Sequence, residues 1–108
     1  MGDGVNNIGD SLLKLIVAIC DDYERREALI RSMLLPRRVD MELRYWNYKV
    51  LDATVEVVGE SNAEMFIKEI GNKIGYAKTS IEDLSESTYK IYKREVVENI
   101  ARRLYLVG

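Results

Sequence analysis

Residues that interrupt regular structure are rare in this chain of 108 residues. It has one proline, Pro36, and between residues 5 and 104 its only glycines are at positions 9, 59, 71 and 75. Proline and glycine are the strongest signals for the end of a helix or strand, so their scarcity favours long helices. We therefore expect an all-α fold, a small helical bundle.

The chain is the size of one compact domain. Apolar residues make up 47% and charged residues 31% of it, a balance that supports a buried core with a solvated surface. No histidine is present and Cys20 is the only cysteine, so a Cys/His zinc site and a disulfide framework within the chain are both excluded. Because Cys20 lies in an apolar run, we expect it to be a buried structural thiol.

Apolar spacings of three and four residues predict four helices. The first is capped by Asp10 and ends before Pro36, the second covers about residues 40–58 and ends at Gly59, the third follows the capping pair Ser61-Asn62, and the last spans residues 87–106. The expected buried positions are Leu13, Ile16, Val17, Cys20, Leu29, Ile30 and Met33; Val39, Leu43, Trp46, Val50, Ala53 and Val57; Met65, Phe66, Ile70 and Ile74; and Tyr89, Tyr92, Val96, Val97, Ile100, Ala101 and Leu104. Residues 49–58 also contain enough Val and Thr to fit a strand, although the helical period continues through them.

Residues 64–84 have the spacing of a helix-turn-helix. Gly71 lies where the two helices of that motif touch, and Gly75 lies at the turn, where φ is often positive. Ile81 and Leu84 would pack the second helix onto the first. This spacing predicts a recognition helix at residues 77–84, in which the early positions could reach DNA: Tyr76, Lys78, Thr79 and Ser80. An ordinary helical corner gives a similar pattern.

The charge distribution changes where this motif begins. Residues 1–67 hold 8 basic and 12 acidic side chains, whereas residues 68–108 hold 8 and 6. A basic face toward DNA phosphates fits this bias, although Glu82 and Asp83 would repel phosphate. The candidate members of this face are Lys73, Lys78, Lys90, Lys93, Arg94, Arg102 and Arg103.

Two segments resemble a known family. Residues 42–46, with the sequence ELRYW, and residues 85–95, with the sequence SESTYKIYKRE, are similar to the phage late-gene transcriptional activators of the RinA and ArpU type. Those proteins resemble region 4 of sigma factors. The resemblance implies a recognition helix in the second segment, with Ser87, Thr88, Lys90 and Arg94 reading DNA, in competition with the spacing pattern, which assigns that role to Lys78, Thr79 and Ser80.

The sequence thus predicts a DNA-binding transcriptional regulator. Residues 1–60 would form a helical scaffold and candidate dimerisation part, and residues 61–108 the helix-turn-helix and the C-terminal amphipathic helix, within one compact domain. The expected partners are double-stranded DNA, a second copy of the chain in a homodimer and, through the resemblance, RNA polymerase. The rival interpretation is a non-catalytic adaptor or structural protein of a phage or mobile-element assembly that binds protein through Tyr45, Trp46 and Tyr48, although burial is the expected fate of Trp46.

No nucleophile-base arrangement, metal-ligand spacing or phosphate-binding loop is recognisable, so we expect no enzyme activity, no cofactor and no metal. The apolar run at residues 12–20 is too short to span a bilayer, which takes about 20 residues. It also lacks the features of a secretory signal, and the first six residues do not match a myristoylation signal. These features predict a cytoplasmic protein without a membrane anchor.

Overall fold

The computed structural model describes residues 9–104, which form five α-helices and one short 3₁₀ turn. The helices are α1 (Asp10–Asp21), α2 (Tyr23–Ser32), α3 (Arg37–Val58), α4 (Glu60–Gly71) and α5 (Glu86–Arg103), and the turn is η2 (Tyr76–Lys78). No strand occurs in this part of the chain. The all-α prediction is confirmed, while the ends of the chain, including residues 1–6 and residues 105–106 of the last predicted helix, lie outside the described residues.

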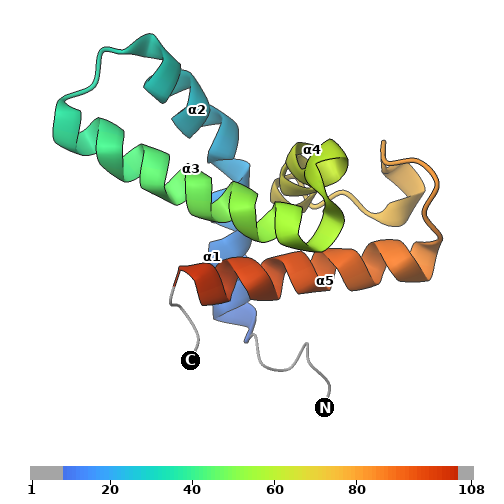
Figure 1. The fold of residues 1–108 in the computed structure, drawn as a ribbon. Coiled ribbons are helices and arrows are strands. Elements are labelled where there is room, and N and C mark those ends of the chain that lie inside the picture. Colours follow the sequence, from blue (N-terminus) through green and yellow to red (C-terminus); the bar gives the residue numbers. More distant parts are fainter. Residues whose placement is uncertain (1–8, 105–108) are drawn as a thin grey trace.

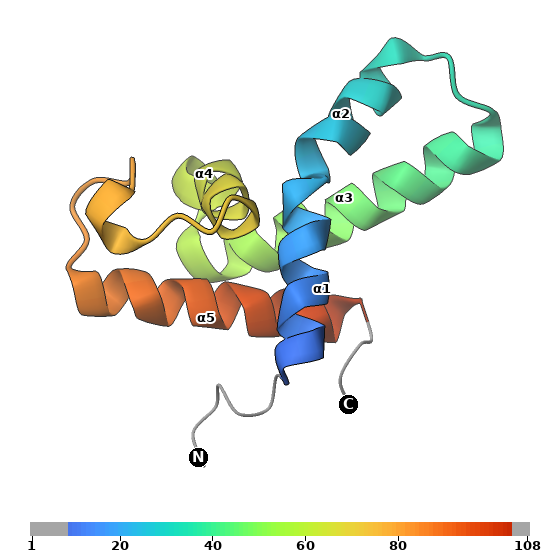
Figure 2. The same cartoon turned by 180° about the vertical axis from the view of Figure 1, so that it is seen from behind.

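The helices form a small body with one projecting arm (Figure 1). α2 and the first half of α3 make a hairpin that extends away from the other helices, whereas α4 crosses over α5 and α1 runs across α5 (Figures 1 and 2). The Cα radius of gyration is 14.2 Å, slightly above the roughly 13 Å of a compact chain of 100 residues, as the projecting hairpin would cause.

The main core lies where α1, α3, α4 and α5 meet. Each of these helices buries one apolar stripe, as the three- and four-residue spacing predicted. Burial of such side chains contributes about 1.5–3 kcal/mol each and is the main force that holds the helices together. The most buried members are Ile16, Val50, Ala53, Ile67, Ile70, Val96, Ile100 and Ala101.

α3 confirms the predicted second helix and shows that the strand alternative for residues 49–58 was wrong. Gly59 ends α3, with a φ of 84° that favours glycine, and its N–H donates to the Val55 carbonyl at 2.8 Å. α4 begins directly afterwards at Glu60, so Ser61 and Asn62 lie inside the helix and do not cap it.

The predicted first helix is divided in two at Asp22. α1 and α2 meet there at an angle, so the apolar stripe does not continue straight from one to the other (Figure 2). Asp10 is the first helical residue, preceded by Gly9, and makes no capping hydrogen bond. Ile16, Cys20 and Ile30 are buried as expected, but Leu13 is 42% and Met33 is 85% exposed, which corrects the prediction that they belong to the core.

A buried polar network joins α2 to α3. Arg26, which is only 5% exposed, donates to the Asn47 side-chain oxygen and to the Ile19 carbonyl at 2.8 Å. The Asn47 amide donates in turn to the Tyr23 carbonyl and to the Glu27 carboxylate. Because buried polar groups are costly without partners, this network fixes one arrangement of the hairpin.

Trp46 corrects a second burial prediction. Its side chain lies in the projecting half of α3, where α2 packs on the side that carries Asn47, and it remains 37% exposed. Val39 is exposed for the same reason. The apolar stripe of α3 therefore continues into the projecting half of the helix, where too few helices surround it to bury it.

Gly71 marks the closest approach between helices. A Cβ atom at this position would lie 2.5 Å from the Asp21 nitrogen and 2.6 Å from its Cα. The prediction that a small residue is needed at a helix crossing is thus confirmed for Gly71, but the helix that it touches is α1 and not a helix after the turn.

We predict that Gly71→Ala destabilises the protein by about 1–3 kcal/mol, because α1 and α4 must move apart to accept the new methyl group. The loss should occur although alanine has the higher helix propensity. Urea denaturation followed by far-ultraviolet circular dichroism would measure it. Gly75→Ala is the matched control, since a Cβ there meets nothing within 4 Å and the φ of −94° suits any residue. Equal stability of the two variants would contradict the close-contact argument.

Candidate nucleic-acid interface

Residues 77–84 are not a helix, which corrects the recognition helix that the spacing pattern predicted. α4 ends at Gly71, earlier than the predicted Ile74, and η2 covers only residues 76–78 before the backbone becomes extended at Thr79. Residues 72–85 form a structured connection between α4 and α5, which we call the α4–α5 loop. It is longer than the roughly three- or four-residue turn of a standard helix-turn-helix.

Glu69 organises this loop. The residue is 3% exposed, and its carboxylate accepts hydrogen bonds from the Thr79 hydroxyl at 2.6 Å, the Ser80 N–H at 2.8 Å and the Tyr89 hydroxyl at 2.7 Å. Thr79 also accepts from the Ile81 N–H at 3.0 Å. One buried carboxylate on α4 therefore connects the middle of the loop to the first turns of α5.

The electrostatics of Glu69 follow from these donors. Burial alone would raise its pKa, but the hydrogen bonds from Thr79, Tyr89 and Ser80, with the nearby Lys93 ammonium, outweigh burial and lower the pKa below its usual value. Burial, followed by the hydrogen bond to Glu69, raises the pKa of Tyr89 to about 12. At neutral pH a charged carboxylate and a protonated phenol therefore face each other.

The apolar side chains of the predicted motif are buried by packing within the loop. Ile81 is 7% exposed and packs with Phe66 and Tyr89, with Leu84 beside them. Tyr76 lies against the Tyr89 ring, at 5.7 Å between ring centroids, and its hydroxyl donates to the Leu84 carbonyl. The spacing that resembled a recognition helix thus arises from a loop that folds back on α4 and α5.

The turn glycine was also predicted wrongly. Gly75 has a φ of −94°, whereas positive φ values occur at Lys73 (57°) and Asp83 (65°). The Lys93 ammonium reaches the loop from α5 and donates to the Ile74 carbonyl at 2.6 Å. The turn is therefore held by side-chain hydrogen bonds and does not depend on a flexible glycine.

α5 begins where the second resembling segment begins. Ser85 caps it, because its hydroxyl accepts from the Thr88 N–H at 3.2 Å. This confirms Ser85 as one of the two predicted caps and confirms a helix over the described part of residues 87–106. Glu82 and Asp83 lie before the helix, in the loop.

The first half of α5 has one exposed face with basic and polar side chains, which we call the α5 face. Ser87, Lys90, Ile91 and Arg94 are exposed at relative positions i, i+3, i+4 and i+7, which share one side of a helix. Lys90 forms an ion pair of 2.8 Å with Glu86 in the preceding turn. An exposed pair of this kind is worth at most about 1 kcal/mol, so Lys90 can exchange it for another anion.

A groove runs beside the α5 face. It has a volume of about 370 Å³ and lies between α1, the end of α4 and α5. Lys73, Lys90, Lys93 and Arg94 line it together with the single carboxylate of Glu98, while Leu13, Val17, Ile70 and Val97 supply its apolar walls. Lys73, which follows the end of α4, and three cations of α5 are thus gathered at one place.

The structure separates the predicted site residues into two groups. Ser87, Lys90 and Arg94 share the α5 face, Thr88 is half-buried next to it, and Lys93 is half-buried at the groove. Tyr76 and Thr79 are engaged in the loop. Lys78 and Ser80 are exposed on the loop and belong to no α-helix. Ile91 was missed, because an exposed isoleucine cannot be recognised before the orientation of its helix is known.

The two C-terminal arginines of the predicted basic face have protein partners. Arg103 forms ion pairs with Asp52 and, at 3.0 Å, with Glu56 on α3. Arg102 donates to the Asn99 side chain at 3.2 Å. The Arg103 ion pairs join the end of α5 to α3, and the basic face is therefore smaller than predicted.

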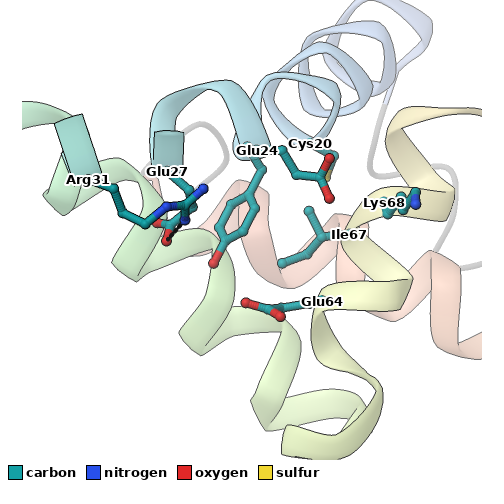
Figure 3. A pocket seen from close by; sticks show the side chains of 8 residues that line it. Cys20, Glu24, Glu27, Arg31, Glu64, Ile67 and Lys68 are labelled. Carbon is teal, nitrogen blue, oxygen red and sulfur yellow. Dashed lines mark ion pairs between the residues drawn. The ribbon is translucent and has the colours of Figure 1, made fainter. Parts of the chain in front are cut away.

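An acidic cavity of about 520 Å³ lies between α2 and α4 (Figure 3). Glu24 and Glu27 enter from α2 and Glu64 from α4, with Arg31 and Lys68 at its margins. Burial, partly offset by Arg26, raises the pKa of Cys20 to about 12, so this buried residue is a protonated structural thiol, as predicted. The cavity offers an anion no favourable environment and supplies no activated nucleophile.

Within residues 9–104, no group of three or more Cys, Asp or Glu side chains is arranged to hold a metal ion. None of the described helices is both long and apolar enough to cross a bilayer. Comparisons with models of protein families, with curated proteins and with solved structures find no match to this chain.

We predict that Glu69→Gln destabilises the protein by about 1–3 kcal/mol at pH 7, because an amide cannot accept all three hydrogen bonds. The pKa of Glu69 is lowered by folding, so its ionisation stabilises the folded state above the usual glutamate pKa, and this contribution is lost as the pH falls through the lowered value.

Urea midpoints measured from pH 7 down to pH 3 should therefore fall more for the wild type than for Glu69→Gln. Glu64→Gln, an exposed position on the same helix, is the control and should behave like the wild type. Parallel curves for the wild type and Glu69→Gln would show that the carboxylate does not hold the loop.

Proposed function

We propose that the chain is a sequence-specific DNA-binding protein that uses α5 as its recognition helix, in the manner of the phage late-gene activators that its sequence resembles. The observation that carries this proposal is the α5 face, with Ser87, Lys90, Ile91 and Arg94 exposed along one side of a capped helix beside the groove that gathers Lys73 and Lys93. The resembling segment and the α5 face coincide.

The arrangement of helices supports this assignment. α3 packs against both α4 and α5, and α4 lies across α5 (Figure 1). Phe66 on α4 contacts the rings of Tyr89 and Tyr92 on α5, at 5.7 and 6.2 Å between centroids. The α4–α5 loop replaces the usual short turn and fixes the start of α5 through Glu69.

Each residue type on the α5 face has a use in a DNA groove. Arg94 can bind guanine with two parallel hydrogen bonds or contact a phosphate, Lys90 can release Glu86 for a phosphate, and Ile91 can contact a thymine methyl group. Ser87, near the helix N-terminus, can donate to a phosphate where the helix dipole also favours an anion. Glu86 and Glu95 limit the positive charge, so binding would depend on these few cations.

In this proposal the protein is a transcriptional regulator that binds double-stranded DNA in the cytoplasm. The family resemblance adds RNA polymerase as a further partner. Replacement of Lys90 and Arg94, which lie one helical turn apart on the α5 face, tests this function. We predict that Lys90→Ala/Arg94→Ala lowers DNA affinity at least about tenfold. The slope of log binding constant against log salt concentration should also become shallower by about two, because each lost phosphate contact releases about one counterion fewer.

Fluorescence anisotropy of labelled duplexes from the DNA upstream of the encoding gene, at two salt concentrations, measures both quantities. Arg25→Ala/Arg31→Ala is the charge-matched control, since both arginines are exposed on α2 in ion pairs with neighbouring acids. It should bind like the wild type. Absence of salt-sensitive binding by the wild type, or equal losses in both double variants, would refute α5 as the DNA-reading helix.

One observation favours the adaptor as a second candidate function. Tyr45 is 49% and Tyr48 62% exposed, and the neighbouring Trp46 is also exposed. Aromatic side chains are enriched where proteins bind one another, and none of these three lines the groove beside α5. The same DNA titration separates the two functions, because a regulator must bind DNA with a steep loss of affinity as salt rises, whereas an adaptor need not bind DNA.

A further inference from the structure

The exposed apolar side chains concentrate on the hairpin of α2 and α3. Met33 and Leu34, at its tip, are 85% and 86% exposed, the highest values among the large hydrophobic residues of the described chain. Val39, Met41, Tyr45 and Trp46 follow on the first half of α3. Contiguous apolar surface of this kind marks a protein-binding site.

A hollow on α3 shows what this surface offers to a partner. It has a volume of about 430 Å³ and is lined by Arg38, Met41, Glu42, Tyr45 and Trp46. α2 packs on the side of α3 that carries Asn47, whereas all five residues that line the hollow are exposed. The hairpin also projects away from the other helices in both views (Figures 1 and 2). The hollow therefore lies on an open helix face with one charge of each sign.

The two charges have no partners within the described chain. Among residues 9–104, neither Arg38 nor Glu42 takes part in an ion pair, whereas the nearby Arg44 pairs with Asp40 at 2.8 Å. Arg38 and Glu42 are one helical turn apart on the same side of α3. Such a pair is self-complementary: when two copies of the helix pack antiparallel, each arginine meets the other copy's glutamate.

We propose that this face binds a second copy of the chain in an antiparallel, two-fold symmetric dimer. With the symmetry axis level with Asp40, Arg38 lies opposite the second copy's Glu42, and the hollow of each copy faces the other copy. The same alignment brings Leu34 at the tip toward Trp46 of the second copy. One axis thus pairs both charges and covers the apolar side chains of Met41, Tyr45 and Trp46 in each copy.

The dimer leaves the α5 face free. α5 packs mainly on α3, and its first turns lie far from the hairpin tip in both views (Figures 1 and 2). The dimer is independent of the proposed DNA binding and would present two α5 helices, one from each copy. Because a single helix face and a loop tip are small for an interface, we expect dissociation in the micromolar range, at the weak end for specific association.

Charge exchange tests the pairing. Sedimentation velocity of the protein without DNA, between about 5 and 200 μM, should show a concentration-dependent dimer of the 12.5 kDa chain. Arg38→Glu alone and Glu42→Arg alone should each weaken dimerisation at least about tenfold, because like charges then meet across the axis. The double variant Arg38→Glu/Glu42→Arg should dimerise like the wild type, since both pairs are restored with their signs exchanged.

Arg31→Glu on α2 is the control for net charge and should leave dimerisation unchanged, and circular dichroism verifies that every variant keeps its helices. A wild type that stays monomeric up to 200 μM would overturn the dimer and point to another protein as the occupant. A dimer that both single variants leave intact, or that the double variant fails to restore, would overturn the antiparallel pairing. Since these measurements contain no DNA, their failure is distinct from failure of the proposed function.

Discussion

The ionised carboxylate of Glu69, buried between α4 and the α4–α5 loop, is the contact on which the proposed site depends. A charge so poorly exposed is stable only because three donors surround it, two from the loop and one from α5. Those donors fix where the loop passes and therefore where Ser85 caps α5. The orientation of Lys90 and Arg94 is thus determined by a residue on another helix that does not itself lie on the α5 face.

Much of the helical architecture was predictable from local patterns. The spacing of apolar residues predicted α3, α4 and α5 within a few residues, and Gly59 and Ser85 predicted their ends, because helix period and capping are local properties. The bend at Asp22 was not predictable in this way. It lies next to the point where Gly71 of α4 approaches the backbone of Asp21, a contact between residues far apart in the sequence.

The candidate site was predictable only in part. Ile81 and Leu84 have the spacing of a recognition helix, yet both pack inside a loop, since burial of an apolar side chain does not determine the conformation of its backbone. The hydrogen bonds that hold this loop link residues 10 and 20 positions apart. The predicted burial of Trp46 was wrong for a related reason. A regular spacing of apolar residues indicates that a helix face is suited to burial, but not whether the same chain supplies the surface that covers it.

Because Cys20 is buried, its rate of chemical labelling can be used to measure how often the helices around it separate. The thiol is the only one in the sequence, is 3% exposed, and is kept protonated by its raised pKa. A thiol-specific reagent can react only when α1 separates from α4, because attack requires an accessible thiolate. The rate of labelling in the wild-type protein therefore measures how often this helix contact breaks. A binding partner that stabilises the helix packing would lower the rate, and one that destabilises the packing would raise it.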